Sequence, residues 1–167
     1  MRTLWAPWRM EYILNPKPDA CILCLSEHGE DDAQRLVLYR GRKAFVIMNK
    51  FPYTNGHLMV APLRHVADLT ELDQEEGAEI FWLLQESTRI LRHSCRPEGV
   101  NIGLNMGEAA GAGIREHLHV HLVPRWNGDA SFMTPICQIR VIPEHLAATR
   151  ASLLPHFAAL PLCPLPV

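Results

Sequence analysis

Long apolar runs are absent from this chain of 167 residues. No window approaches the eighteen or more apolar residues that a membrane-spanning helix needs. The stretch MRTLWAPWRMEYI at the start carries Pro7 and several charges, and it lacks the continuous apolar core of a secretory signal peptide. These absences predict a soluble, cytoplasmic protein that has no membrane partner.

Neither positive nor negative charge is in large excess, since the formal net charge is −2. Nothing in the overall charge therefore favours binding to nucleic acid or to an acidic membrane surface, and we expect no nucleic-acid partner. Internal repeats and Gly/Ser-rich linkers are absent as well. With 48% hydrophobic residues, we expect one domain over residues 1–157, with residues 1–20 packed on it and a proline-rich tail at 158–167.

An even set of cysteines, as a disulfide framework requires, is not present: there are five. Two of them, Cys21 and Cys24, form a C-x-x-C pair, which in the cytosol fits two zinc ligands, a redox pair or two small buried residues. Two cysteines are only half of a metal site. The histidines that qualify to complete it are His28, His65, His93 and His117. The spacing alone does not select among them.

The pattern of apolar residues predicts an antiparallel α+β fold, because strands follow one another through tight turns with few helices between them. The hairpin at 36–48 is indicated by LVLYR and AFVIM around the turn GRK, and Thr70 or Asp73 is suited to cap a helix running to about His93. The other predicted elements are strands at 57–61, 100–106 and 136–142, a histidine-bearing strand to Val123, and a helix at 144–157.

The most unusual stretch is REHLHVHLVPRW, residues 115–126, in which three histidines alternate with apolar residues. A strand has a side-chain period of two, so His117, His119 and His121 are expected to project from one face, about 6–7 Å apart, while the apolar set anchors the strand to the core. Half-exposed polar positions would explain one such histidine. Three in strict alternation favour a metal site or nucleophilic catalysis on phosphate.

The segment HLHVHLV resembles the signature of the histidine triad family, His-x-His-x-His followed by two apolar residues. The resemblance extends over roughly residues 20 to 126, because MNKFPYTNGHLMVAPLRHV and NMGEAAGAG are similar to the family's upstream segments and occur in the same order. It implies the family's α+β fold, an antiparallel sheet of about five strands with a long central helix and a C-terminal helix. It also implies a homodimer.

The resemblance further implies an enzyme that cleaves nucleotides at the α-phosphate through a covalent nucleotidyl-histidine. In the family the nucleophile is the middle histidine of the triad, and the matching position is His119. A neutral imidazole nitrogen suits this role, because it attacks phosphorus without first losing a proton. His121 then corresponds to the residue that contacts the phosphate oxygens or the departing phosphate, and His57 to a supporting histidine at the edge of the site.

Substrate-binding positions follow from the same resemblance. Asn49 matches a residue that binds ribose hydroxyls, and Asn105 matches a polar position on the phosphate side. The family often has Gly-Gln-Ser or Gly-Gln-Thr where this chain reads Gly111-Ala112-Gly113, so phosphate contacts there are expected from the backbone amide of Gly113.

For the metal, members of the family that contain zinc use the C-x-x-C pair, a histidine after the second strand and the first triad histidine. Carried over to this chain, the ligands are Cys21, Cys24, His65 and His117. This Cys₂His₂ set leaves no open position, which implies a structural zinc. No organic cofactor is implied.

The flanks LWAPWRMEYI and VPRWNGDASFM are similar to the branch of the family that includes bacterial diadenosine tetraphosphate phosphorylases. The expected substrate is a nucleoside or dinucleoside polyphosphate, with diadenosine tri- or tetraphosphate favoured and either water or phosphate as acceptor. Three alternatives stay open: a phosphoramidate or AMP-lysine hydrolase of the same fold, a nucleotide-binding module with little turnover, and a redox protein centred on Cys21 and Cys24.

Overall fold

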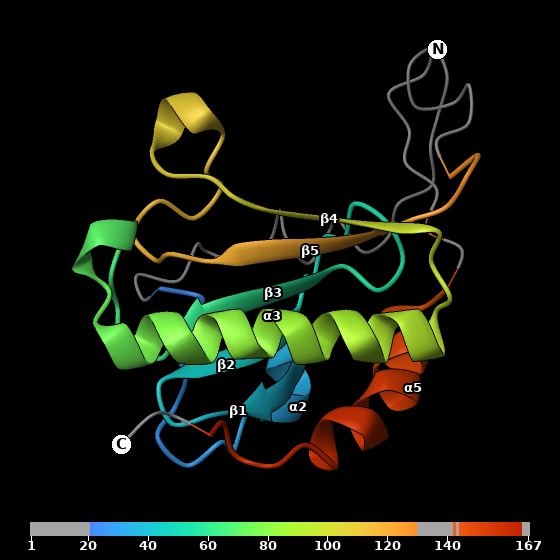
Figure 1. Cartoon of the computed structure of the whole chain (residues 1–167), viewed down its shortest axis with the longest axis horizontal. Coiled ribbons are helices and arrows are strands. Elements are labelled where there is room, and N and C mark those ends of the chain that lie inside the picture. The colour runs from blue at the N-terminus through green and yellow to red at the C-terminus, as the bar shows by residue number, and fades with distance from the viewer. Residues whose placement is uncertain (1–20, 130–141, 143, 165–167) are drawn as a thin grey trace.

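The computed structural model describes residues 21–129, 142 and 144–164. Five strands form one antiparallel sheet in the order β1-β2-β3-β5-β4 (Figure 1). They are β1 (Val37–Arg40), β2 (Ala44–Met48), β3 (Leu58–Pro62), β4 (Gly99–Leu104) and β5 (Val120–Arg125). The predicted antiparallel α+β class is confirmed, as are the hairpin at 36–48 and the strands near 57–61 and 100–106.

The long predicted helix is α3 (Gln74–Ser94), which lies across one face of the sheet (Figure 1). Of the two predicted caps, Asp73 is the one used: its side chain accepts the N–H of Glu76, and the Glu76 side chain accepts the N–H of Asp73. The C-terminal helix α5 (Leu146–Ala158) begins two residues later than predicted. The short elements are α2 (Asp32–Arg35), η1 (Leu69–Glu71) and η2 (Glu108–Ala110).

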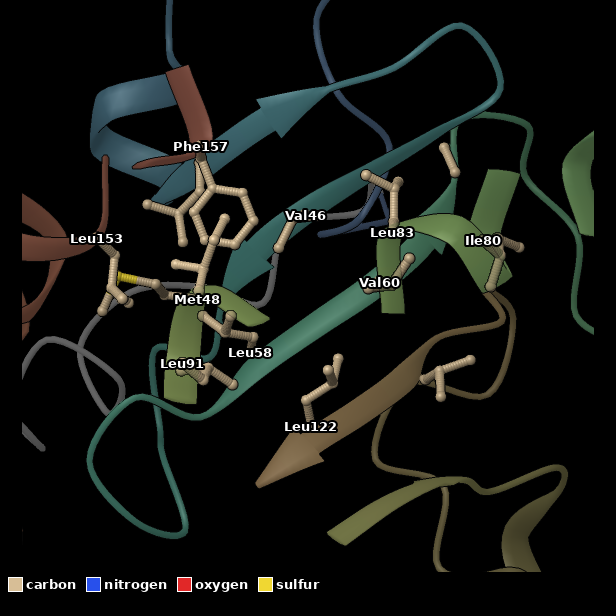
Figure 2. Packing of buried hydrophobic residues seen from close by; sticks show 14 residues of the cluster. Val46, Met48, Leu58, Val60, Ile80, Leu83, Leu91, Leu122, Leu153 and Phe157 are labelled. Atoms are coloured by element: carbon tan, nitrogen blue, oxygen red, sulfur yellow. The ribbon is translucent and has the colours of Figure 1, made fainter. Parts of the chain in front are cut away.

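The main core fills the space between the sheet, α3 and α5 (Figure 2). Alternate strand residues enter it, as the side-chain period of two requires, and α3 and α5 supply residues at helical spacing. Its labelled members are Val46, Met48, Leu58, Val60, Ile80, Leu83, Leu91, Leu122, Leu153 and Phe157. Val120 and Leu122, which alternate with the histidines, belong to this core and fix β5 against α3.

The opposite face of the sheet carries a smaller cluster in which Leu23 covers residues of β1, β2 and β3. Within the described residues, this cluster takes no member from β4 or β5. The strand pairing shows which residue borders this cluster. Ile47 of β2 pairs with Met59 of β3, and Met59 pairs with His121 of β5. Paired residues stand on the same face, so His121 lies on the face opposite α3, just beyond the covered part.

The histidine strand begins later than predicted. The β5 ladder starts at Val120, and His117 and His119 precede it. If the β3–β5 register continued, Pro62 would face Leu118, and proline has no N–H to give to a ladder. The N–H of Leu118 instead donates to the carbonyl of Val66, at 2.7 Å, and the alternation survives because Leu118, Val120 and Leu122 are all buried.

A buried carboxyl group, which the sequence did not reveal, holds the β1–β2 turn against α3. Glu79 is fully buried, and its oxygens accept the main-chain N–H groups of Arg42 (3.1 Å), Lys43 and Ala44 (2.9 Å). Three donors therefore satisfy a group that would be costly to bury alone. Gly41 lies against the same carboxyl group, and a Cβ there would also come within 2.8 Å of the Ala44 carbonyl oxygen.

Two predictions fall outside the described residues: the packing of residues 1–20 and nearly all of the strand at 136–142. Of the C-terminal tail, residues 159–164 are described. There the hydroxyl of Tyr39 donates to the carbonyl of Pro161, and Cys163 is buried. None of the helices in the described residues has the length and apolar character to cross a membrane.

The Glu79 contacts predict a large loss of stability when they are removed. Glu79→Ala leaves three buried N–H groups without their acceptor and should lower the free energy of unfolding by about 2–4 kcal/mol. Glu79→Gln keeps one acceptor oxygen and should cost less. As a control, Glu75→Gln removes only an exposed ion pair with Lys43 and should stay within about 0.5 kcal/mol. Urea denaturation of the three variants measures this, and equal midpoints would contradict it.

Candidate active site and metal centre

Four of the residues singled out in the sequence come together at one end of the sheet. The ligand-type atoms of Cys21, Cys24, His65 and His117 all lie within 4.8 Å of one another. The Cys21 sulfur is 3.4 Å from Nδ1 of His117, and the Cys24 sulfur is 3.2 Å from Nδ1 of His65. Of the candidate histidines, His28 and His93 are not part of this group. The donors are two thiols and two imidazoles, the set and the spacing that a tetrahedral zinc ion takes.

His117 presents one defined nitrogen to that group. Its Nε2–H donates to the carbonyl of Pro62 at 2.9 Å, so Nδ1 carries the lone pair and faces the thiols. A second hydrogen bond of this kind is typical of metal-ligating histidines, because it fixes the ring and its tautomer. Burial lowers the pKa of His117, which keeps the ring neutral, and burial followed by the adjacent Cys21 raises the pKa of Cys24.

His119 is oriented by the main chain of His117. Its Nδ1 lies 2.8 Å from the His117 carbonyl oxygen, so Nδ1 carries the proton and donates it to that carbonyl. The neutral ring then has its lone pair on Nε2. His119 is almost fully buried at 4% exposure, and its ring stands edge-on to that of His121 with 4.8 Å between the centroids. An imidazole in this tautomer has on Nε2 the lone pair that nucleophilic attack would require.

A chain of hydrogen bonds runs through the other two histidines. The main-chain N–H of Tyr53 donates to Nδ1 of His57 at 3.1 Å, and His57 Nε2 lies 3.0 Å from Nδ1 of His121. Because His57 Nδ1 is an acceptor, its proton is on Nε2 and is donated to His121. His121 therefore keeps its own proton on Nε2. The chain thus presents a proton donor beside the lone pair of His119.

His121 is held in its neutral form. Burial, with a smaller contribution from the nearby His119 ring, lowers the pKa of His121 to about 4. At pH 7 the ring therefore carries one proton, and the hydrogen bond from His57 leaves that proton on Nε2. A neutral His121 therefore places no positive charge beside the His119 ring.

The loop that carries His57 is anchored by residues that the sequence did not single out. Gly56 has a φ of 73° and turns the chain from Asn55 back to His57. The hydroxyl of Thr54 donates to the carbonyl of Pro124 at 2.8 Å. Asn55 donates to Glu144 and accepts from Thr149 of α5. These partners lie 70 to 94 residues away in the sequence, so the residues around PYTNG give no local sign of them.

Of the predicted substrate-binding residues, Asn49 lies next to His57, whose carbonyl accepts the main-chain N–H of Asn49 at 3.0 Å. Asn49 follows β2, and its side-chain oxygen accepts the N–H of Phe51 at 2.8 Å, which orients its amide nitrogen as a donor. Asn105 follows Leu104, the partner of Val120, and so lies level with His119. Gly113 is exposed in the loop before His117.

Two residues at the end of β5 take part in the turn that follows it. Arg125 forms an ion pair with Asp129 and donates to Asn101. Trp126 is half-buried, with its main-chain N–H bonded to Asp129. Both therefore stabilise the turn after β5.

Comparisons with known proteins agree with this geometry. The family model described as "HIT domain" matches residues 30–128. The chain is 39% identical to the AP-4-A phosphorylase of Mycobacterium tuberculosis (strain H37Rv), over 96% of this chain and 87% of that protein. It is 30% identical to the bis(5'-adenosyl)-triphosphatase of Saccharomyces cerevisiae (strain YJM789), over 54% of this chain and 44% of that one.

Among solved structures, a zinc-bound histidine triad family protein from Mycobacterium smegmatis aligns with a TM-score of 0.66 and 31% identity. The alignment covers 83% of this chain and 94% of that one. The four clustered ligand-type residues, the buried His119 and the ring contact between His119 and His121 occur in a fold that matches this neighbour. Together with the match over residues 30–128, these findings show that the chain belongs to the histidine triad, or HIT, family.

Proposed function

We propose that the protein transfers a nucleotidyl group from a dinucleoside polyphosphate, with diadenosine tri- or tetraphosphate preferred, onto His119 and then onto an acceptor. The observation that carries this proposal is the orientation of His119: the His117 carbonyl holds the proton on Nδ1, and the lone pair on Nε2 lies beside a neutral donor. The similarity to an AP-4-A phosphorylase and a bis(5'-adenosyl)-triphosphatase supports the substrate class.

In the first step, Nε2 of His119 attacks the α-phosphorus. An N–P bond forms, and the bond from that phosphorus to the bridging oxygen breaks. With diadenosine tetraphosphate, AMP is then bound to His119 and the leaving group is ATP. The ring gains positive charge, which the Nδ1–H···O=C bond to His117 stabilises. His121 directs its Nε2–H at the phosphate oxygens, and such a hydrogen bond is worth about 2.7–4 kcal/mol in a transition state.

In the second step, an acceptor oxygen attacks the same phosphorus and the N–P bond breaks, which returns the lone pair to His119. Water as acceptor releases AMP, and inorganic phosphate releases ADP. The similarity to the phosphorylase over 96% of the chain favours phosphate. In the bound state we assign ribose contacts to Asn49 and phosphate contacts to Asn105 and the main chain of Gly113.

We also propose that Cys21, Cys24, His65 and His117 bind a structural zinc ion, because the donor set and its spacing fit tetrahedral coordination. When bound, zinc would tie the N-terminal segment at Cys21 and Cys24 to the strand of the histidines. His119, His121 and His57 then remain available for phosphate. The four described cysteines outside the masked segments are free thiols, which suits a protein that works in the reducing cytoplasm.

A homodimer is part of the proposal. Within the described part of the chain, β4 is an edge strand, and beside it α3 exposes Phe81 at 64% and β4 exposes Ile102 at 49%. These side chains border a hollow of about 310 Å³. Pairing of two β4 edges across a two-fold axis would cover the free edge and this apolar surface.

The nucleophile is tested by trapping the intermediate. With diadenosine tetraphosphate, the wild type should gain a mass equal to one AMP residue, removable by acid, because the N–P bond is acid-labile. His119→Ala should show no adduct and lose activity on the order of 10³-fold or more. His28→Ala, at an exposed histidine outside the site, should behave like wild type. Turnover by His119→Ala at the wild-type rate would refute the proposal.

The acceptor is tested by product analysis. With diadenosine tetraphosphate and labelled phosphate, we expect ATP together with ADP that carries the label in its β-phosphate, since phosphate attacks the nucleotidyl-histidine. Without phosphate, the yield of ADP should fall to zero. AMP and ATP in equal amounts, whether or not phosphate is present, would show that water is the acceptor.

The metal is tested by analysis of the purified protein. We expect about one zinc per chain, and Cys24→Ser should lose it and melt at a lower temperature, because metal binding adds to the stability of the folded state. Cys95→Ser alters a cysteine outside the cluster and should retain the zinc. Equal zinc content in the two variants, or a melting temperature that a chelator leaves unchanged, would argue against the site.

A further inference from the structure

Gly103, in the interior of β4, is a glycine that the fold does not require. Its φ lies outside the left-handed region that favours glycine. A Cβ built at this position meets no described atom within 4 Å, so packing does not exclude a side chain either. Glycine weakens a strand interior, and the close approach of a ligand or of another main chain is one reason for a glycine to stand there.

The position of Gly103 relates it to the histidines. It pairs directly with His121 in the β4–β5 ladder, and such partners stand on the same face about 4.5–5.5 Å apart. A side chain at 103 would therefore rise beside the His121 ring, on the face opposite α3. Asn105 follows on the same side, level with His119. Gly103 leaves a gap in the surface next to the proposed proton donor.

We propose that Gly103 keeps this gap open for the substrate, so that the departing phosphate chain of a dinucleoside polyphosphate lies against the main chain of β4 beside His121. The inference rests on the proposed function and names a residue that determines which ligands fit. The α-phosphate must lie at His119, and His121 reaches the bridging and departing phosphates only if they pass on its own side. Gly103 is the neighbour of His121 on that side.

Edge pairing of β4 with a second copy would use main-chain groups within the plane of the sheet. The Cβ of residue 103 would point out of that plane, so edge pairing by itself does not require a glycine. A second glycine, Gly99, provides a comparison. It lies in the same strand on the same face, it also meets no described atom within 4 Å, and it pairs with Arg125 about 13 Å farther along.

The test compares Gly103→Ala and Gly103→Val with Gly99→Val. For each protein we would measure kcat and KM for diadenosine tetraphosphate and the melting temperature. Affinities would be measured by calorimetry for two ligands, AMP and a diadenosine tetraphosphate analogue with methylene bridges. Gly103→Val should lower kcat/KM, and the affinity for the analogue, by about tenfold to a hundredfold. Gly103→Ala should have a smaller effect on both. The affinity for AMP should fall less, because AMP has no departing phosphates.

The melting temperature separates this role from a packing role. Valine favours strands over glycine, so Gly103→Val should melt at or above the wild-type temperature while its affinity falls. Gly99→Val should also melt at or above the wild-type temperature, but its kcat/KM and its affinities for both ligands should match those of the wild type. A Gly103→Val protein with unchanged kcat/KM would overturn the inference, and so would one that loses stability or binds AMP and the analogue equally weakly. A wild type that neither binds nor cleaves these nucleotides would refute the proposed function itself.

Discussion

The hydrogen bond from Nδ1 of His119 to the main-chain carbonyl of His117 is the constraint on which the site depends. It decides which nitrogen of His119 holds the lone pair, and a main-chain acceptor does so whatever the side chain of residue 117 binds. That side chain is itself fixed twice, by the Pro62 carbonyl and by the thiols of Cys21 and Cys24. One residue thus joins the metal-type cluster to the nucleophile.

The two faces of the sheet differ, and one of them is covered over only part of its area. One face packs on α3 and α5 and contains the apolar residues that alternate with the histidines (Figures 1 and 2). On the other face, Leu23 covers β1 to β3. The row that begins with buried Ile47 and Met59 continues to His121 and ends at exposed Gly103. Reactive groups therefore stand at the border between a dry interior and an accessible surface.

Several of these features could be predicted from the sequence because each depends on residues that are close together in the chain. The capping residue Asp73, the hairpin around GRK and the alternation at 117–122 each depend on neighbours within a few positions. The four clustered cysteine and histidine residues were gathered by resemblance, since their spacing in the sequence left several completions open. Their proximity is now a property of the fold. The late start of β5 was missed because its cause, Pro62, lies in another strand.

The contacts that sequence reasoning could not find join residues far apart in the chain. Asn55 meets α5, and Glu79 meets the β1–β2 turn. Glu79 binds main-chain N–H groups only, so its hold on the turn does not depend on which side chain residue 42 carries. Lys43 differs, because its side chain also pairs with Asp73 and Glu75 at the start of α3. Over evolutionary time, position 42 should therefore change more freely than position 43. Gly41 and Glu79, which touch, should be inherited as a pair. The contact between the β1–β2 turn and α3 would then be visible in related sequences as covariation between positions 41 and 79.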